Sequence, residues 1–164
     1  MKSRSYISWD EYFMGVAVLS ANRSKDPNTK VGACIVNPEK RIVGIGYNGF
    51  PYGCDDDVFP WCNEGDFTDT KYPYVVHAEP NAILNSTTKL NGCTLYVTLF
   101  PCHECVKLII QSGIKHIIYM SDKYSGTESD QAAKRMLDAA NVTYEKMKEI
   151  AITIRSNDSE ETDF

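Results

Sequence analysis

Residues 94–120 read TLYVTLFPCHECVKLIIQSGIKHIIYM and contain a strand, a helix and a second strand in succession. The apolar runs 94–99 and 114–120 are short and rich in β-branched and aromatic residues, as buried strands are. Between them, residues 102–112 carry apolar side chains at helical spacing, and Gly113 is well placed to end that helix. The segment therefore predicts the α/β class.

The flanking sequence extends this pattern in both directions. Ser8-Trp9-Asp10-Glu11 has the spacing of a capping box, so a helix should begin near Ser8 and end before Asp26-Pro27-Asn28. Two strands at 31–36 and 41–47, joined by a turn at 37–40, predict an antiparallel hairpin. The remaining expected elements are helices at 78–86 and 128–140 and a short strand at 142–147. The order α-β-β-α-β-α-β-α-β predicts a three-layer α/β/α fold, with a five-stranded mixed sheet covered on both faces.

Length and charge limit the organisation and the partners. A chain of 164 residues suits one domain, expected over 1–155, and the polar residues 156–164 are expected to form an acidic, disordered tail. The formal net charge is −5, of which the tail carries four negative charges, so the body is near −1 and does not predict a nucleic-acid-binding face. No apolar run approaches the ~20 residues of a membrane span, and the N-terminus has no signal-peptide core, so a cytoplasmic protein without a membrane partner is expected.

Six cysteines could form three disulfides, but that interpretation fits small secreted domains better than this chain. Buried thiols or metal ligands are favoured instead. These cysteines are Cys34, Cys54, Cys62, Cys93, Cys102 and Cys105.

Two short motifs carry the chemistry, His77-Ala78-Glu79 and Pro101-Cys102-His103-Glu104-Cys105. Cys102 and Cys105 are three residues apart at a helix start, so both sulfurs point from one face, whereas His103 between them would face away. One His and two Cys ligands leave the fourth tetrahedral position of Zn²⁺ open, which is typical of a catalytic site.

Glu79 follows the histidine by two residues, which places a carboxylate beside the metal without making it a ligand. A lone Cys-x-x-Cys could be a redox pair, and a structural zinc would need a fourth protein ligand. The joint occurrence of both motifs favours a catalytic zinc site instead. The spacing H-x-E…P-C-x-x-C is the signature of zinc nucleobase deaminases, in which the glutamate carries protons.

Nearly the whole chain resembles the deoxycytidylate (dCMP) deaminase family of the cytidine deaminase superfamily. The most distinguishing stretches are 46–57 (GYNGFPYGCDDD) and 121–124 (SDKY), because the zinc motif alone does not separate this family from free-cytidine or tRNA adenosine deaminases. The other matching stretches are 9–14, 23–28, 31–33, 77–83 and 96–102.

The resemblance implies a cytidine-deaminase-like fold and hydrolytic deamination of dCMP to dUMP and ammonia, which supplies dUMP for thymidylate synthesis. It implies a catalytic Zn²⁺ held by His77, Cys102 and Cys105, with Glu79 as the proton carrier. It also implies substrate contacts from the backbone of Ala78, from Asn48, and from Arg23 and Tyr124 near the sugar and 5′-phosphate. A forked cation such as Arg23 suits a phosphate, although the same residue could be a solvated charge at a helix end.

The loop 46–57 could be a plain glycine-rich turn, but in the family it helps to form an effector site between subunits of a homohexamer. The resemblance implies that dCTP activates and dTTP inhibits there, through Asn48, Gly49, Asp56 and Asp57. Because two of these residues are acidic, Mg²⁺ would have to mediate phosphate contact. The resemblance to some relatives makes Cys54 a candidate ligand of a second zinc, but the sequence offers no convincing partner set, so we do not expect such a site.

Two rival functions differ in class. A deaminase that acts on single-stranded or flipped bases would need a basic groove, which the charge balance does not indicate. A non-catalytic zinc-binding module would have no need for Glu79. Pro80 is tolerated in the first turn of a helix, although it biases Glu79 away from helical ψ.

Overall fold

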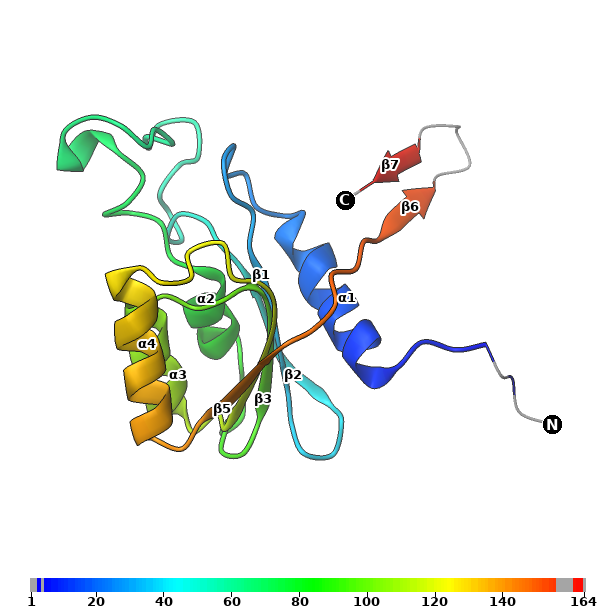
Figure 1. The fold of residues 1–164 in the computed structure, drawn as a ribbon. Coiled ribbons are helices and arrows are strands. Elements are labelled where there is room, and N and C mark those ends of the chain that lie inside the picture. Colours follow the sequence, from blue (N-terminus) through cyan, green and yellow to red (C-terminus); the bar gives the residue numbers. More distant parts are fainter. Residues whose placement is uncertain (1–2, 4, 156–160, 164) are drawn as a thin grey trace.

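The computed structural model describes residues 3, 5–155 and 161–163 (Figure 1). The central sheet has the strand order β2-β1-β3-β4-β5. Strand β1 pairs antiparallel with β2 and β3, whereas β3–β4 and β4–β5 are parallel pairs, so the sheet is mixed as predicted. The strands are β1 (Gly32–Val36), β2 (Ile42–Tyr47), β3 (Thr94–Leu99), β4 (His116–Ser121) and β5 (Thr143–Lys146).

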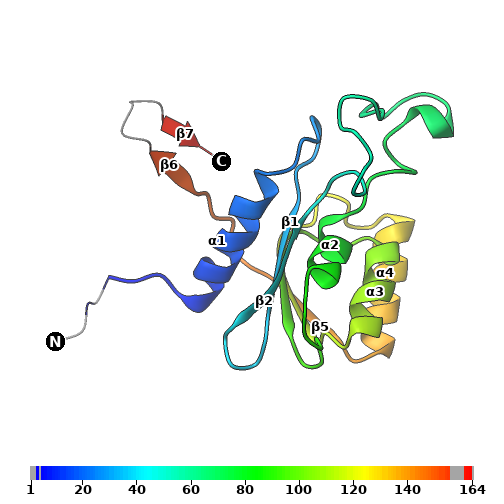
Figure 2. The same cartoon turned by 180° about the vertical axis from the view of Figure 1, so that it is seen from behind.

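Helices cover both faces of this sheet and complete the three layers. Helix α1 (Trp9–Ala21) lies on one face; α2 (Ala78–Leu84), α3 (His103–Ser112) and α4 (Glu128–Ala139) lie on the other (Figures 1 and 2). Each interface has its own apolar core, one built around Phe13, Met14 and Tyr96 beneath α1, and the other around Leu95, Ile109 and Ile117. The predicted fold class is confirmed.

Local sequence signals set the ends of the helices. The Ser8 Oγ accepts the N–H of Glu11 at 3.1 Å, and the Glu11 carboxylate accepts the N–H of Ser8 at 2.8 Å, so the predicted capping box forms. Gly113 adopts φ 88°, a left-handed conformation that favours glycine, and ends α3. All elements expected within 8–147 are present, with ends shifted by two residues at most.

The contact between β2 and α2 is close because Gly46 has no side chain. A Cβ on Gly46 would lie 2.3 Å from the backbone N of Ala82 and 2.4 Å from the backbone O of Ala78. The N-terminal turn of α2, which carries the His-x-Glu motif, is therefore seated directly on the sheet.

Residues 48–76 form a long excursion whose one short helix is η1 (Phe67–Asp69). An aromatic cluster packs within it: the ring centroids of Phe50 and Trp61 are 4.0 Å apart, and Phe59 lies 5.6 Å from Phe50 and 5.2 Å from Tyr74. Gly49 and Val76 close its base through paired backbone hydrogen bonds of 3.0 and 2.8 Å. The excursion is thus held by its aromatic cluster and by the bridge at its base, and ion pairs of Lys71 with Asp26 and of Asp56 with Lys25 join it to the segment after α1.

The C-terminal segment contains a pairing that was not expected. Strand β6 (Thr153–Arg155) pairs antiparallel with β7 (Glu161–Asp163). The expected tail spans 156–164, and of these residues 156–160 and 164 lie outside the described part of the chain. No helix in the described part of the chain has the length and apolar character needed to cross a bilayer.

Candidate metal centre and cavity

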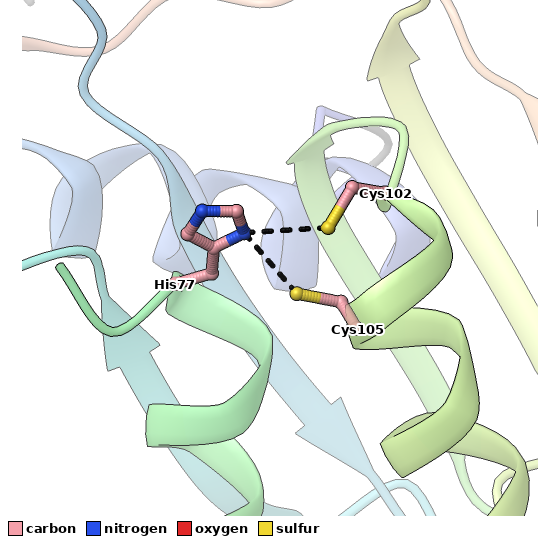
Figure 3. A group of neighbouring side chains, drawn as sticks. All are labelled: His77, Cys102 and Cys105. Carbon is pink, nitrogen blue, oxygen red and sulfur yellow. Dashed lines mark hydrogen bonds between the residues drawn. The ribbon is translucent and has the colours of Figure 1, made fainter. Parts of the chain in front are cut away.

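Two helix N-termini bring the chemistry-bearing residues together. His77 is the N-cap of α2 and Cys102 is the N-cap of α3, both with extended backbone. Because α2 and α3 lie side by side on one face of the sheet, His77, Cys102 and Cys105 meet at their adjacent ends (Figure 3). The structure thus brings together residues that are separated by 25 and 28 positions in the chain.

The three potential ligand atoms form a compact triangle. The Nδ1 of His77 lies 3.5 Å from the Sγ of Cys102 and 3.3 Å from the Sγ of Cys105, and all three atoms lie within 4.8 Å of one another (Figure 3). A tetrahedral zinc ion with bonds of ~2.0–2.3 Å to nitrogen and sulfur fits ligand atoms at this separation. Their chemistry also fits, because imidazole and thiolate are the ligands that zinc prefers.

The thiols differ in their readiness to ionise. The pKa of Cys102 is lowered to about 4, chiefly by the hydrogen bond from Cys105 and also by that from His77. The pKa of Cys105 is raised by its hydrogen bond with Cys102 and by burial, and that of His77 is raised chiefly by its hydrogen bond with Cys102. The surroundings of Cys102 thus favour its thiolate, the form in which a cysteine binds a metal.

His103 points to other partners. Its Nδ1 lies 2.8 Å from the Ser129 hydroxyl, and its Nε2 lies 3.1 Å from the Glu104 carboxylate. It does not join the metal-ligating cluster, as the sequence predicts from its position on the helix.

Glu79 lies in the first turn of α2, two residues after His77, and only 3% of it is exposed. Its burial raises the pKa of the carboxyl group, the usual effect of a low-polarity environment. Pro80 occupies the next position of that turn, where a missing N–H breaks no helical hydrogen bond. Glu79 therefore keeps helical placement despite the proline that follows it.

A cavity of about 300 Å³ opens beside this cluster. His77, Glu79 and Cys102 line it, together with three of the predicted substrate contacts, Ala78, Asn48 and Tyr124. Leu99 and Phe100 supply apolar walls. The volume is at the small end of the range for ligand pockets and suits a single small molecule.

The other predicted site residues lie elsewhere. Arg23 is exposed just beyond α1 and does not line the cavity. Gly49 belongs to the base of the excursion, where it pairs with Val76. Asp56 forms an ion pair with Lys25, and the backbone N–H of Asp57 bonds to the Asp55 carboxylate at 2.8 Å; neither Asp56 nor Asp57 lines the cavity.

The wall formed by Asp26, Thr29 and Lys71 was not predicted. The sequence Asp26-Pro27-Asn28 predicts the end of a helix, and the Asp26 carboxylate does form a turn there, accepting the N–H of Asn28 at 2.8 Å. Lys71 lies in a segment without periodicity, and nothing local indicates that it is buried. The turn propensity of Asp26 was the one signal that could have drawn attention to this wall.

All six cysteines lie in the described part of the chain, and none forms a disulfide. Cys34 is buried, and burial raises its pKa to about 12, so packing accounts for this residue, and Cys93 is buried as well. Cys54 is half-buried and Cys62 is exposed in the excursion.

The geometry defines a metal-binding site with a buried carboxylate at its side, and comparison with known proteins gives it a family. Residues 7–121 match the family described as "Cytidine and deoxycytidylate deaminase zinc-binding region". The chain belongs to this cytidine and deoxycytidylate deaminase family, and its catalytic core is a zinc-binding deaminase domain.

Individual relatives narrow the comparison. The chain is 59% identical over 147 residues to deoxycytidylate deaminase of Homo sapiens, covering 88% of this chain and 83% of the relative. It is 57% identical over 152 residues to a probable deoxycytidylate deaminase of Drosophila melanogaster, covering 88% and 75%. Among solved structures, the dCMP deaminase of cyanophage S-TIM5 in complex with dCMP and dUMP matches with a TM-score of 0.68 and 31% identity, over 84% of this chain and 95% of that chain.

Proposed function

We propose that this protein is a zinc-dependent dCMP deaminase, which converts dCMP and water into dUMP and ammonia. The observation that carries the proposal is the buried Glu79 carboxylate, which lines the cavity beside three convergent metal ligands. The identity with deoxycytidylate deaminases supports dCMP as the substrate.

His77 Nδ1 and the sulfurs of Cys102 and Cys105 would hold the zinc ion. When bound, zinc supplies a Lewis acid that lowers the pKa of a water molecule and makes it a nucleophile at neutral pH. Glu79 would accept one proton from the water and pass it to N3 of cytosine as the water oxygen bonds to C4. It would then carry the second proton to the C4 amino group, so that the C–N bond breaks and ammonia leaves. Its raised pKa suits a group that must both accept and return a proton near neutrality.

The remaining contacts would orient the nucleotide. Ala78 lines the cavity, and its backbone would bond to the base edge, while Leu99 and Phe100 would exclude water from the base. Asn48 and Tyr124 would contact the deoxynucleotide from the cavity wall. Arg23, although outside the cavity lining, would meet the 5′-phosphate at the rim.

Regulation and assembly form a second level of the proposal. The loop 46–57 would bind dCTP as an activator and dTTP as an inhibitor through Asn48, Gly49, Asp56 and Asp57, with Mg²⁺ between phosphate and carboxylate. The single domain over 1–155 would assemble into a homo-oligomer, a hexamer, in the cytoplasm and supply dUMP for thymidylate synthesis. Rates measured with and without dCTP and dTTP, and the mass from sedimentation equilibrium, test these points.

Substrate and mechanism are tested together by ammonia release and one substitution. We expect release from dCMP and none from cytosine in a single-stranded oligonucleotide. Glu79→Gln should keep its zinc and lose about 10²- to 10⁴-fold in turnover, the usual contribution of a general acid–base. Glu104→Gln is the matched control, because this glutamate lies between the two cysteines but is exposed and paired with Lys107. Retained activity in Glu79→Gln, with zinc bound, would refute the mechanism.

A further inference from the structure

A buried ion pair between Lys71 and Asp26 forms part of the wall of the cavity that Glu79 also lines. The Nζ of Lys71 lies 2.6 Å from the Oδ2 of Asp26, and the two side chains are 10% and 2% exposed. Both residues line the cavity. Among the cavity-lining residues that the structure describes, Lys71 is the one lysine or arginine.

The Asp26 carboxylate is fully committed to the protein. Its Oδ1 accepts the backbone N–H groups of Asn28 and Thr29 at 2.8 and 3.1 Å, and its Oδ2 accepts from the Asn48 side chain at 3.3 Å besides Lys71. Asp26 therefore has no lone pair to offer a ligand. Its evident effect is to fix the position of two neighbours that also line the cavity, Asn48 and Lys71.

The Lys71 backbone is fixed as well. Its N–H donates to the carbonyl of Cys62 at 2.9 Å, and its carbonyl accepts the N–H groups of Tyr74 and Val75 at 3.0 and 2.9 Å. The ammonium group has three N–H donors, and in the described part of the chain its one hydrogen-bond partner is Asp26. Donors are thus left over in the cavity wall, where they can bond to an acceptor on a bound ligand.

Given the proposed function, on which this inference rests, we propose that Lys71 is a substrate-binding residue that donates a hydrogen bond to an uncharged oxygen of the nucleoside moiety. Two oxygens have this chemistry, the 3′-hydroxyl of the sugar and the O2 carbonyl of the base. The 5′-phosphate is excluded by charge: Asp26 neutralises Lys71 at 2.6 Å, so a phosphate placed there would face a carboxylate as well as an ammonium group.

Calorimetric titration of the zinc-loaded protein with dUMP and with 2′-deoxyuridine tests this without depending on turnover. We expect Lys71→Met to raise the Kd of both ligands by a similar factor, about 10- to 100-fold, as for a hydrogen bond that involves a charged group. A weaker affinity for dUMP alone would mean that Lys71 binds the phosphate, and would overturn the proposal. If the wild type does not deaminate dCMP, the proposed function is refuted, but the Kd values of wild type and Lys71→Met can still be compared.

Lys71→Met leaves Asp26 buried without its cation, which lowers stability whether or not Lys71 binds the substrate. The same substitution is therefore repeated in an Asp26→Asn background. The Asp26→Asn single variant is the matched reference, since it changes the contact with Asn48 in the same way and keeps Lys71. If Lys71 only neutralises Asp26, its removal in this background changes the Kd by less than about twofold, and the proposal is wrong. A further rise of about 10-fold or more supports it.

Two additional measurements complete the design. Lys134→Met is the control, because Lys134 forms a partly buried ion pair with Asp130 and neither residue lines this cavity. This substitution should leave both Kd values unchanged. Titration with 2′,3′-dideoxyuridine identifies the acceptor: if Lys71→Met has no effect on this ligand, the acceptor is the 3′-hydroxyl, and if the factor persists, it is the base carbonyl. Either result supports the proposal.

Discussion

Gly46→Ala should damage the metal centre from a position that touches no ligand. Gly46 lies in β2, directly beneath the first turns of α2, and a Cβ there would meet the backbone N of Ala82 at 2.3 Å and the backbone O of Ala78 at 2.4 Å. Real Cβ atoms stay at least 3.0 Å from such atoms. Because the obstacles are backbone atoms of a helix, no side chain can turn aside, and α2 must move off the sheet by roughly 1 Å.

The expected losses of stability and of turnover both follow from that displacement of α2. Overpacking a core usually costs about 1–3 kcal/mol, and a backbone obstacle places Gly46→Ala near the upper limit. For a chain of this size, about 3 kcal/mol corresponds to a melting temperature lowered by roughly 6–12 °C. Since α2 carries His77 and Glu79, a shift of about 1 Å should also lower turnover by about 10²-fold.

Differential scanning calorimetry and initial rates of dCMP deamination, with zinc content measured on the same samples, check these values. Gly32→Ala is the matched comparison, because a Cβ there would meet the backbone O of Ala17 at 1.8 Å and would displace α1, which lies on the opposite face of the sheet. Gly15→Ala is the neutral control, since its nearest neighbour is a side-chain carbon at 3.5 Å. The reasoning is refuted if Gly46→Ala keeps full turnover, or if Gly32→Ala loses as much turnover at an equal fall in melting temperature.

Two further predictions concern the metal and pH. Dialysis against a chelator should remove about one zinc ion per chain and abolish deamination. It should also lower the melting temperature by roughly 5–10 °C, the shift expected when a ligand at about 100 times its Kd is withdrawn. Dialysis should not lower the melting temperature of Cys105→Ala further, and a normal zinc content in that variant would contradict the ligand assignment. The pKa of Asp122 is held below its usual value, chiefly by the hydrogen bond from Lys146 at 2.6 Å. A carboxylate whose pKa is lowered by folding stabilises the fold above its unfolded pKa, and this contribution is lost as the pH falls through the folded value. Urea titrations from pH 6 to pH 3 should therefore show a steeper loss of stability in the wild type than in Lys146→Met, and equal slopes would count against the pair.

The fold was predictable because most of its elements carry local signals. The strands at 94–99 and 116–121 are apolar because they are buried on both faces, and Ser8 and Gly113 mark helix ends through hydrogen bonds made within a few residues. The metal ligands were predictable for the same reason. Each of them lies at or near a helix N-terminus, in a motif whose spacing is local.

The part of the cavity wall formed by Asp26 and Lys71 could not be predicted in this way. Lys71 and Asp26 are separated by 45 residues, and their ion pair depends on the path of an excursion that has no apolar periodicity. Likewise, β6 and β7 are three-residue strands, too short to show an alternating pattern. A sequence pattern reports burial of apolar side chains well, but it does not report burial of a charge that is paired with a distant partner.

The residues that carry out the reaction and the residues that select the ligand are therefore held in place in different ways. The metal ligands and Glu79 are positioned by helix termini that are seated on the sheet. The wall that contains Asp26, Asn48 and Lys71 is positioned by polar contacts among these side chains. Loops can exchange such contacts without disturbing the sheet, so the ligand can change while the reaction is kept. Substitutions at Lys71 should therefore act mainly on the Kd of the bound nucleoside or nucleotide, whereas substitutions at Gly46 should act mainly on the rate of the reaction.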